Sequence, residues 1–208
     1  MLGERYWGKM RKNKRLQIAL LVCGGAVLLA ILTVVLLSVL LPKDEPAQPS
    51  QGDAGTIRFY LPYEGDIRTA AIYTDLDRQF YFCDANYGST EALSREEVSA
   101  NPEWEVLWNY FDCLIDGNPE GLRALLARDA NGIPIPDFAQ QMVYEMKVTR
   151  VGEETANGAL RVTYRLEYRI HRNNGTYRRD VGSDAVRPEY LTLTKDENGN
   201  FRIFDIQR

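Results

Sequence analysis

An uncharged apolar run near the N-terminus most restricts how this chain can fold. From Ile18 to Leu41 the sequence reads IALLVCGGAVLLAILTVVLLSVLL, and only Thr33 and Ser38 interrupt it with polar side chains. An α-helix of this length spans about 36 Å, which is enough to cross a bilayer with some tilt. A helix of a soluble core would need a polar stripe on its solvent side. The sequence therefore predicts a single transmembrane helix over residues 16–41.

The charges on either side of the run predict its orientation. The first fifteen residues hold six Arg or Lys against the single acid Glu4, whereas Lys43 on the far side is followed at once by Asp44 and Glu45. Basic residues concentrate on the cytoplasmic side of membrane helices. We therefore expect residues 1–15 to form a cytoplasmic basic tail and the chain beyond the helix to be extracytoplasmic, in a single-pass protein of the cell membrane.

Two kinds of N-terminal processing compete with a permanent anchor. A cleavable signal peptide has a shorter apolar core and a small-x-small site after it, but this run ends in Val39-Leu40-Leu41-Pro42. The sequence Leu20-Leu21-Val22-Cys23 faintly resembles a bacterial lipobox, yet Val22 is bulky and the run continues far beyond Cys23. An uncleaved helix is favoured over both alternatives.

The segment after the run has the composition of a tether. Residues 42–55, PKDEPAQPSQGDAG, contain three prolines and no large apolar side chain, so they cannot pack a core and we expect a flexible linker. Residues 56–100 follow as an added strand-rich segment. Aromatic and β-branched residues predict strands there over 57–61, 67–74 and 79–83.

Two consecutive helices are predicted from Pro102 onwards. Apolar side chains recur at steps of three and four residues along one face of the first: Trp104, Leu107, Trp108, Phe111, Leu114 and Ile115. Gly117 is the expected stop, and Asn118-Pro119 begins the second helix. Shorter helices are expected after the cap Ser94 and from Asp137 to Tyr144.

From residue 146 the pattern changes to the period of two that is typical of strands. Apolar and polar side chains alternate from Arg161 to Arg172, so one face of this strand is core and the other faces solvent. Further strands are expected over residues 146–151, 176–181, 190–195 and 201–206. Helices followed by meandering strands predict an α+β fold with helices packed on a curved antiparallel sheet.

The sequence YFDCLIDGNPEGL, from Tyr110 to Leu122, with Leu125-Leu126 beyond it, resembles the opening helix pair of the nuclear transport factor 2-like (cystatin-like) superfamily. The resemblance covers residues 101–208 and includes the closing GNFRIFDI, which is similar to the usual last strand. It implies that helices and sheet enclose a cone. The layout of tail, membrane helix and outer domain also resembles the bitopic assembly components of bacterial type IV secretion and conjugation machines.

Enzymes of this superfamily, such as ketosteroid isomerases and polyketide cyclases, place an acid or His with a Tyr inside the cone. Parity puts Tyr164 and Tyr168 on the inner face, where Phe111 joins them as a candidate pocket residue, and it puts the single His171 on the opposite face. No acid is expected beside the two tyrosines. We therefore predict no catalytic residues, no metal, no cofactor and no enzymatic activity. Small-molecule binding, or an isomerase- or dehydratase-type activity in the cone, is the alternative.

Arginines follow the outer face of the same strand. Arg161, Arg165 and Arg169 are spaced about 13 Å apart along it, and Arg178 and Arg179 are expected on a neighbouring strand. Two interpretations are open. The arginines form cross-strand ion pairs on a solvated face, or they bind an acidic partner surface or a second copy of the chain.

The charge of the outer part limits its partners. The chain has a formal net charge of −4, and the basic tail contributes +5, so the remainder carries −9. Nucleic acid is therefore not an expected partner. We predict a membrane-tethered, extracytoplasmic interaction or scaffold module that binds a protein or itself. Cys83 and Cys113 are the cysteines outside the run, and no pattern decides whether they pair.

Overall fold

The computed structural model describes residues 57–84, 90–130 and 134–208, which belong to the compact unit Gln51–Arg208. The predicted tail, membrane helix and linker, residues 1–55, lie outside the described residues. In the described part of the chain, no helix is long and apolar enough to cross a membrane.

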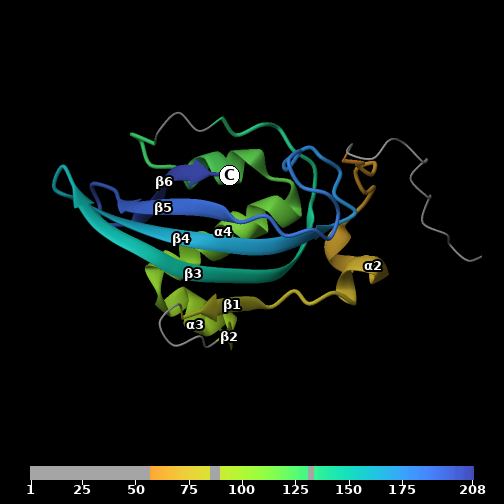
Figure 1. The fold of residues 1–208 in the computed structure, drawn as a ribbon, viewed down its shortest axis with the longest axis horizontal. Helices are drawn as coiled ribbons and strands as arrows, with labels where there is room; N and C mark the ends of the chain where they lie inside the picture. Colours follow the sequence, from red (N-terminus) through yellow and green to blue (C-terminus); the bar gives the residue numbers. More distant parts are fainter. Residues whose placement is uncertain (1–56, 85–89, 131–133) are drawn as a thin grey trace, which may run out of the picture. The chain divides into compact units, whose positions relative to one another are not determined.

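Six strands form one sheet in the order β2-β1-β3-β4-β5-β6 (Figure 1). Their bounds are β1 Phe80–Cys83, β2 Thr90–Leu93, β3 Met142–Ala156, β4 Ala159–His171, β5 Glu189–Lys195 and β6 Phe201–Gln207. The α+β class is as predicted, but β1 and β3 run parallel while the other neighbours are antiparallel. A parallel pair needs a long crossover, which the helices between β2 and β3 supply. Register shifts at Tyr144/Lys147 and Arg150/Gly152 accompany the curvature of β3.

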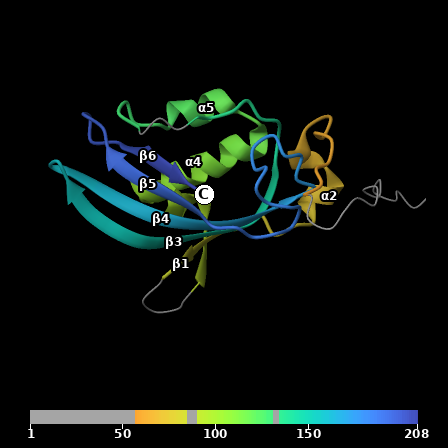
Figure 2. The same cartoon turned by 45° about the horizontal axis from the view of Figure 1, so that its top comes forward.

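The main helices pack on one face of this sheet (Figure 2). The helical elements are η1 Ile67–Thr69, α2 Ala71–Thr74, α3 Arg95–Ala100, α4 Pro102–Asp116 and α5 Pro119–Ala124. Leu107, Phe111 and Leu114 of α4 are at most 1% exposed, which confirms its predicted apolar face. No described helix covers the middle of the opposite face, which we call the outer face.

Capping residues place the helix ends where the sequence predicts them. Ser94 accepts a hydrogen bond from the backbone N–H of Glu97, whose carboxylate accepts one from the Ser94 N–H in return. Asn101 caps α4 ahead of Pro102, and Gly117 ends it in the left-handed region, with φ 63°. These local hydrogen bonds set where the helices begin and end.

A side chain at position 117 should be strongly destabilising. A Cβ there would lie 2.5 Å from the backbone nitrogen of Gln140 and 2.9 Å from the carbonyl carbon of Ala139, in addition to the strain of a positive φ. We expect Gly117→Ala to lower the free energy of unfolding by roughly 2–3 kcal/mol, measured by urea denaturation. Gly158→Ala is the matched control. Gly158 also has a positive φ, 78°, but a Cβ added there would meet no heavy atom within 4 Å. Equal losses in the two variants would contradict the contact with Gln140.

Two predicted strands before β1 are wrong. Residues 57–63 form no strand, although the Tyr60 N–H donates to the Asn173 carbonyl at 2.9 Å. Residues 67–74 form η1 and α2, because the Asp66 side chain accepts from the Arg68 N–H and starts a helical turn. A local cap here outweighs the β-branched composition.

Two predictions after α5 are also wrong. The helix expected from Asp137 to Tyr144 is absent, because Met142 already pairs with His171 at the start of β3. The strand expected over 176–181 is a loop. Long-range strand pairing decides the first conformation, and hydrogen bonds of Asn173 to Arg178 and Val181 hold the second.

The predicted alternation along β4 is confirmed. Val162, Tyr164, Leu166, Tyr168 and Ile170 are each at most 4% exposed and face the helices, within the single hydrophobic core. The thiols of Cys83 and Cys113 are free, which decides the pairing that the sequence left open.

Candidate functional site

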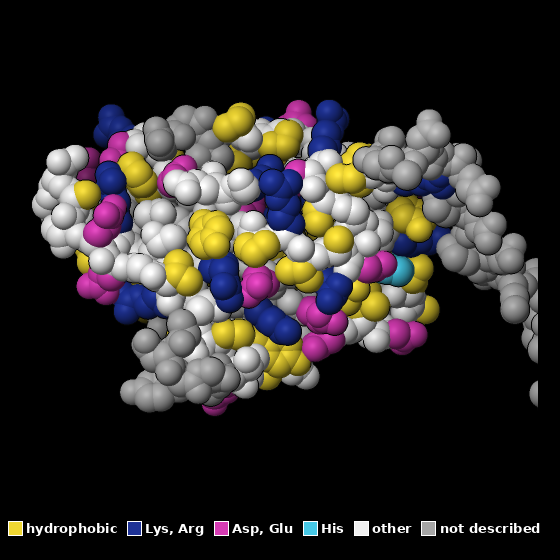
Figure 3. Space-filling model, in the orientation of Figure 1, with side chains coloured by type: hydrophobic (Ala, Val, Ile, Leu, Met, Phe, Trp, Pro, Cys, Tyr) yellow, Lys and Arg dark blue, Asp and Glu magenta, His cyan; other side chains and the backbone are white. Residues whose placement is uncertain are grey.

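The outer face carries the predicted arginines, each in a different setting. The guanidinium carbon of Arg161 lies 3.9 Å from the centre of the Phe204 ring, and Arg165 pairs with Glu167 at 3.0 Å. Arg169 pairs with Glu145 at 2.9 Å and also donates to the Asp184 carbonyl. Figure 3 shows Lys and Arg side chains interspersed with Asp and Glu on this face. The face therefore lacks a continuous basic strip.

Of the three arginines, Arg165 pairs with Glu167 and Arg169 is committed to contacts inside the domain, whereas Arg161 forms no ion pair with a residue that the structure describes. Arg161 lies against Phe204, and a guanidinium stacked in this way keeps its terminal nitrogens for other acceptors, while its Nε is buried. Arg165 is the direct cross-strand neighbour of Tyr190, which is 39% exposed. We call Arg161, Arg165, Tyr190 and Phe204 the outer patch.

The interior contains a carboxylate that the sequence analysis missed. Glu189, at the start of β5, is fully buried. It accepts hydrogen bonds from the hydroxyls of Tyr110 at 2.5 Å and Tyr168 at 2.8 Å, and from Nε of Arg208 at 2.7 Å. The hydroxyl of Tyr177 lies 2.7 Å from that of Tyr110. We call these five residues the buried cluster.

Electrostatics keep the tyrosines of this cluster protonated. Burial, and after it the charge of Glu189, raises the pKa of Tyr110, Tyr168 and Tyr177 well above the ordinary value. A tyrosine in this state donates a hydrogen bond but cannot serve as a base. Both carboxylate oxygens of Glu189 already accept hydrogen bonds from residues of the cluster. The carboxylate is therefore not available to a ligand.

The expectation that no acid lies beside the two inner tyrosines is therefore wrong for both of them. Tyr164 donates to Glu103 of α4 at 2.5 Å, and Tyr168 donates to Glu189. Glu189 has the same strand parity as the buried Leu191 and Leu193, so alternation along β5 already places it inwards. Glu103 gives no such signal, because an acid in the first turn of a helix is ordinary.

Arg178 also departs from its predicted place on the outer face. It is 1% exposed, and its guanidinium binds both oxygens of Asp180 at 2.8 Å. Nη1 lies 3.8 Å from Glu189 and donates to the Tyr168 hydroxyl at 3.1 Å. The predicted strand places Arg178 on a surface, whereas the loop turns it into the core.

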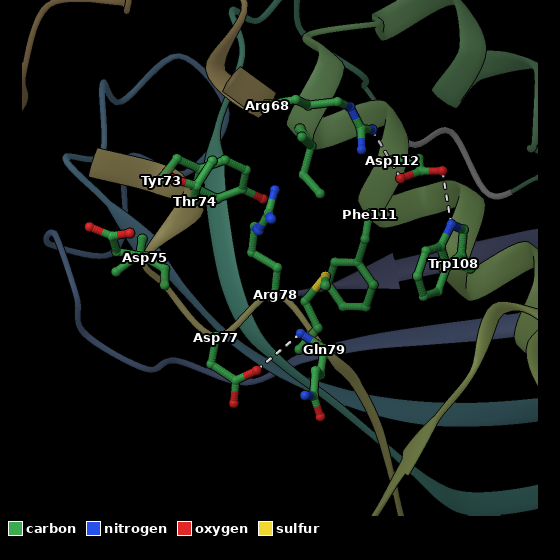
Figure 4. A pocket seen from close by; sticks show the side chains of 13 residues that line it. Arg68, Tyr73, Thr74, Asp75, Asp77, Arg78, Gln79, Trp108, Phe111 and Asp112 are labelled. Carbon is green, nitrogen blue, oxygen red and sulfur yellow. Dashed lines mark hydrogen bonds and ion pairs between the residues drawn. The ribbon is translucent and has the colours of Figure 1, made fainter. Parts of the chain in front are cut away.

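A cavity of about 670 Å³ lies between α4 and the segment from Arg68 to Gln79 (Figure 4). Phe111, predicted as a pocket residue, lines it, whereas Tyr164 and Tyr168 do not and are packed in the core. Arg68 spans the cavity rim to Asp112 at 3.0 Å and Asp116 at 2.7 Å. The cavity can accept an apolar group, but its main cation is already paired. His171 is likewise held by Asp184, at 3.1 Å.

Comparisons with known proteins add only weak structural similarity. No family model matches this sequence, and neither does any curated protein. A crystal structure of a candidate ketosteroid isomerase from Shewanella frigidimarina NCIMB 400 is similar over 51% of this chain and 93% of its own, with 14% identity and a TM-score of 0.34. This similarity assigns no function. In the described part of the chain, no group of three or more His, Cys, Asp and Glu is placed to hold a metal ion.

Proposed function

We propose that the chain is a membrane-tethered, extracytoplasmic interaction module that docks a protein partner, or a second copy of itself, on the outer patch. The observation that carries this proposal is Arg161 stacked on Phe204, on a sheet face that also carries the exposed Tyr190 and that no described helix covers. Arginine and tyrosine are the residues that most often dominate protein interfaces. The apolar run and the linker in the sequence support the tether.

A catalytic role is not part of the proposal. The inner tyrosines and acids satisfy one another, and the closed buried cluster offers a substrate no unpaired donor or base. Within the proposal, residues 101–208 have the nuclear transport factor 2-like cone, and the layout is that of a bitopic component of an envelope assembly. The helix pair followed by a curved sheet supports this assignment.

Crosslinking in membranes tests the docking surface. The photoreactive residue p-benzoylphenylalanine replaces Tyr190 in the full chain, and irradiation should yield an adduct larger than the monomer. Arg161→Glu combined with Arg165→Glu should reduce the adduct at least about tenfold, because reversing charges at an interface typically costs 2–5 kcal/mol. Mass spectrometry of the adduct distinguishes a second copy from another protein.

The control separates this patch from surface charge in general. Arg128→Glu changes a side chain that is 95% exposed and has only a distant partner, Glu197 at 4.0 Å, and it should leave the adduct unchanged. Full adduct yield in the double reversal would refute docking on the outer patch.

Small-molecule binding in the cavity of Figure 4 is the alternative, and the volume of the cavity favours it. Native mass spectrometry of the chain released from membranes would then show a bound molecule, which Leu76→Trp should displace by filling the cavity. A chain of bare mass would remove this alternative.

A further inference from the structure

The loop between β4 and β5 is built around Asn173, whose side chain is fully buried. Its Nδ2 donates to the carbonyls of Arg178 and Val181, both at 2.8 Å, and its Oδ1 accepts from the Gly175 N–H at 2.9 Å. Phe59 packs so closely on Gly175 that an added Cβ would lie 2.6 Å from its ring. These contacts hold the loop in one conformation, which suits a preorganised binding site.

This loop borders a second cavity, of about 540 Å³, distinct from the outer patch and from the cavity of Figure 4. Its charged lining residues are Asp137, Arg179, Asp180, Arg187 and Arg208. A volume of this size is in the range of small-molecule sites. Three arginines around one cavity indicate an anionic ligand.

The carboxylates of the cavity are already paired. Asp137 binds Arg123 at 2.8 Å, and Asp180 is held by the buried Arg178 and by Arg187 at 3.3 Å. The charged lining residues and their direct ion-pair partners comprise five arginines (Arg123, Arg178, Arg179, Arg187 and Arg208) and four carboxylates (Glu120, Asp137, Asp180 and Glu189). Among these side chains, one positive charge is left over.

Arg179 carries that charge. Its Nε donates to the Gly175 carbonyl at 3.2 Å, and no ion pair joins it to any residue that the structure describes. The hydrogen bond fixes one edge of the guanidinium and leaves the terminal nitrogens free for a ligand. The planar fork of arginine matches two oxygens of a carboxylate or a phosphate.

We infer that this cavity binds a small molecule through a carboxylate or phosphate group, with Arg179 as the principal contact and Arg187 and Arg208 beside it. Arg208 is oriented for this role because Nε binds Glu189 and the guanidinium carbon lies 4.5 Å from the centre of the Tyr177 ring. The site goes beyond the proposed function, since it shares no residue with the outer patch.

Calorimetry of the full chain in phosphatidylcholine nanodiscs tests the site, with inorganic phosphate and succinate as titrants. We expect a Kd of about 1 mM or tighter for at least one of them. Arg179→Gln should weaken binding at least about tenfold, because a charge-assisted bidentate contact is lost. Arg128→Gln, on an exposed side chain elsewhere, should leave the Kd unchanged.

Nanodiscs that contain phosphatidic acid distinguish two sources of the anion. Weaker apparent phosphate binding in these discs, dependent on Arg179, would identify a lipid headgroup as the occupant, whereas unchanged binding would identify a soluble molecule. Either result supports the site. Absence of binding by both titrants, or an unaltered Kd in Arg179→Gln, would overturn it.

Discussion

Replacing Glu189 by leucine should remove a large part of the stability of the domain. The substitution leaves Arg208 and the hydroxyls of Tyr110 and Tyr168 without their buried acceptor. Removing one partner of a buried charge pair typically costs about 3–5 kcal/mol, and entire domains are stable by only about 5–15 kcal/mol. We expect a loss of about 4 kcal/mol in the free energy of unfolding of residues 51–208, measured by urea denaturation.

Glu197→Leu provides the control for this experiment. The side chain of Glu197 is 91% exposed, so its replacement should change the free energy of unfolding by less than about 0.5 kcal/mol. If Glu189→Leu were equally harmless, the buried cluster would not be a structural element.

Alkaline solution should also unfold the domain. Burial first, and then the charge of Glu189, raises the pKa of Tyr110, Tyr168 and Tyr177. The folded state therefore keeps protons that the unfolded chain releases near pH 10, so the contribution of these groups is complete below about pH 10. It is lost as the pH rises towards their folded pKa values. Each tyrosine removes about 1.4 kcal/mol per pH unit there, and the three together remove about 4 kcal/mol per pH unit. Burial also raises the pKa of Tyr73 and Tyr164, which add to the same slope.

Urea denaturation at several alkaline pH values measures this slope. Tyr177→Phe removes one of these groups and should flatten the slope by about 1.4 kcal/mol per pH unit. Tyr190→Phe, at a tyrosine that is 39% exposed, should not alter it. A tyrosinate absorbance change near pH 10 that is as large in the folded protein as in the urea-unfolded chain would contradict the raised pKa values.

Local and periodic signals account for what the sequence predicts well. The cap Ser94, the helix start at Pro102, the stop Gly117 and the alternation along β4 each depend on neighbouring residues, and the structure has all four. Alternation along β5 also places Glu189 on the inner face, with Leu191 and Leu193.

Other features depend on contacts that no local pattern contains. The loop after β4 is fixed by Asn173, and the turn Asn173-Asn174-Gly175 leads into no strand. Arg178 is buried only because Asp180 neutralises it within the same loop. A sequence pattern that counts arginines on one face therefore misplaces Arg178. It also does not predict that Arg179 lines a cavity.

The structure also narrows the arginine hypothesis. Arg169 is occupied by Glu145 and by the Asp184 carbonyl, and Arg165 pairs with Glu167 beside Tyr190. Arg161 lies opposite Thr194 and forms no ion pair with a residue that the structure describes. The proposed docking surface therefore excludes Arg169 and includes the aromatic side chains of Tyr190 and Phe204. Its partner needs acidic groups to meet the arginines and an apolar surface to meet Tyr190.

Hydroxyl-radical footprinting in native membranes tests the docking proposal most directly. Tyr190 in the outer patch and Tyr63 outside it are 39% and 41% exposed in the isolated chain, so the purified protein should label both to similar extents. The proposal predicts that labelling of Tyr190 falls several-fold in native membranes while that of Tyr63 is unchanged. The same ratio of Tyr190 to Tyr63 labelling in both preparations would contradict it.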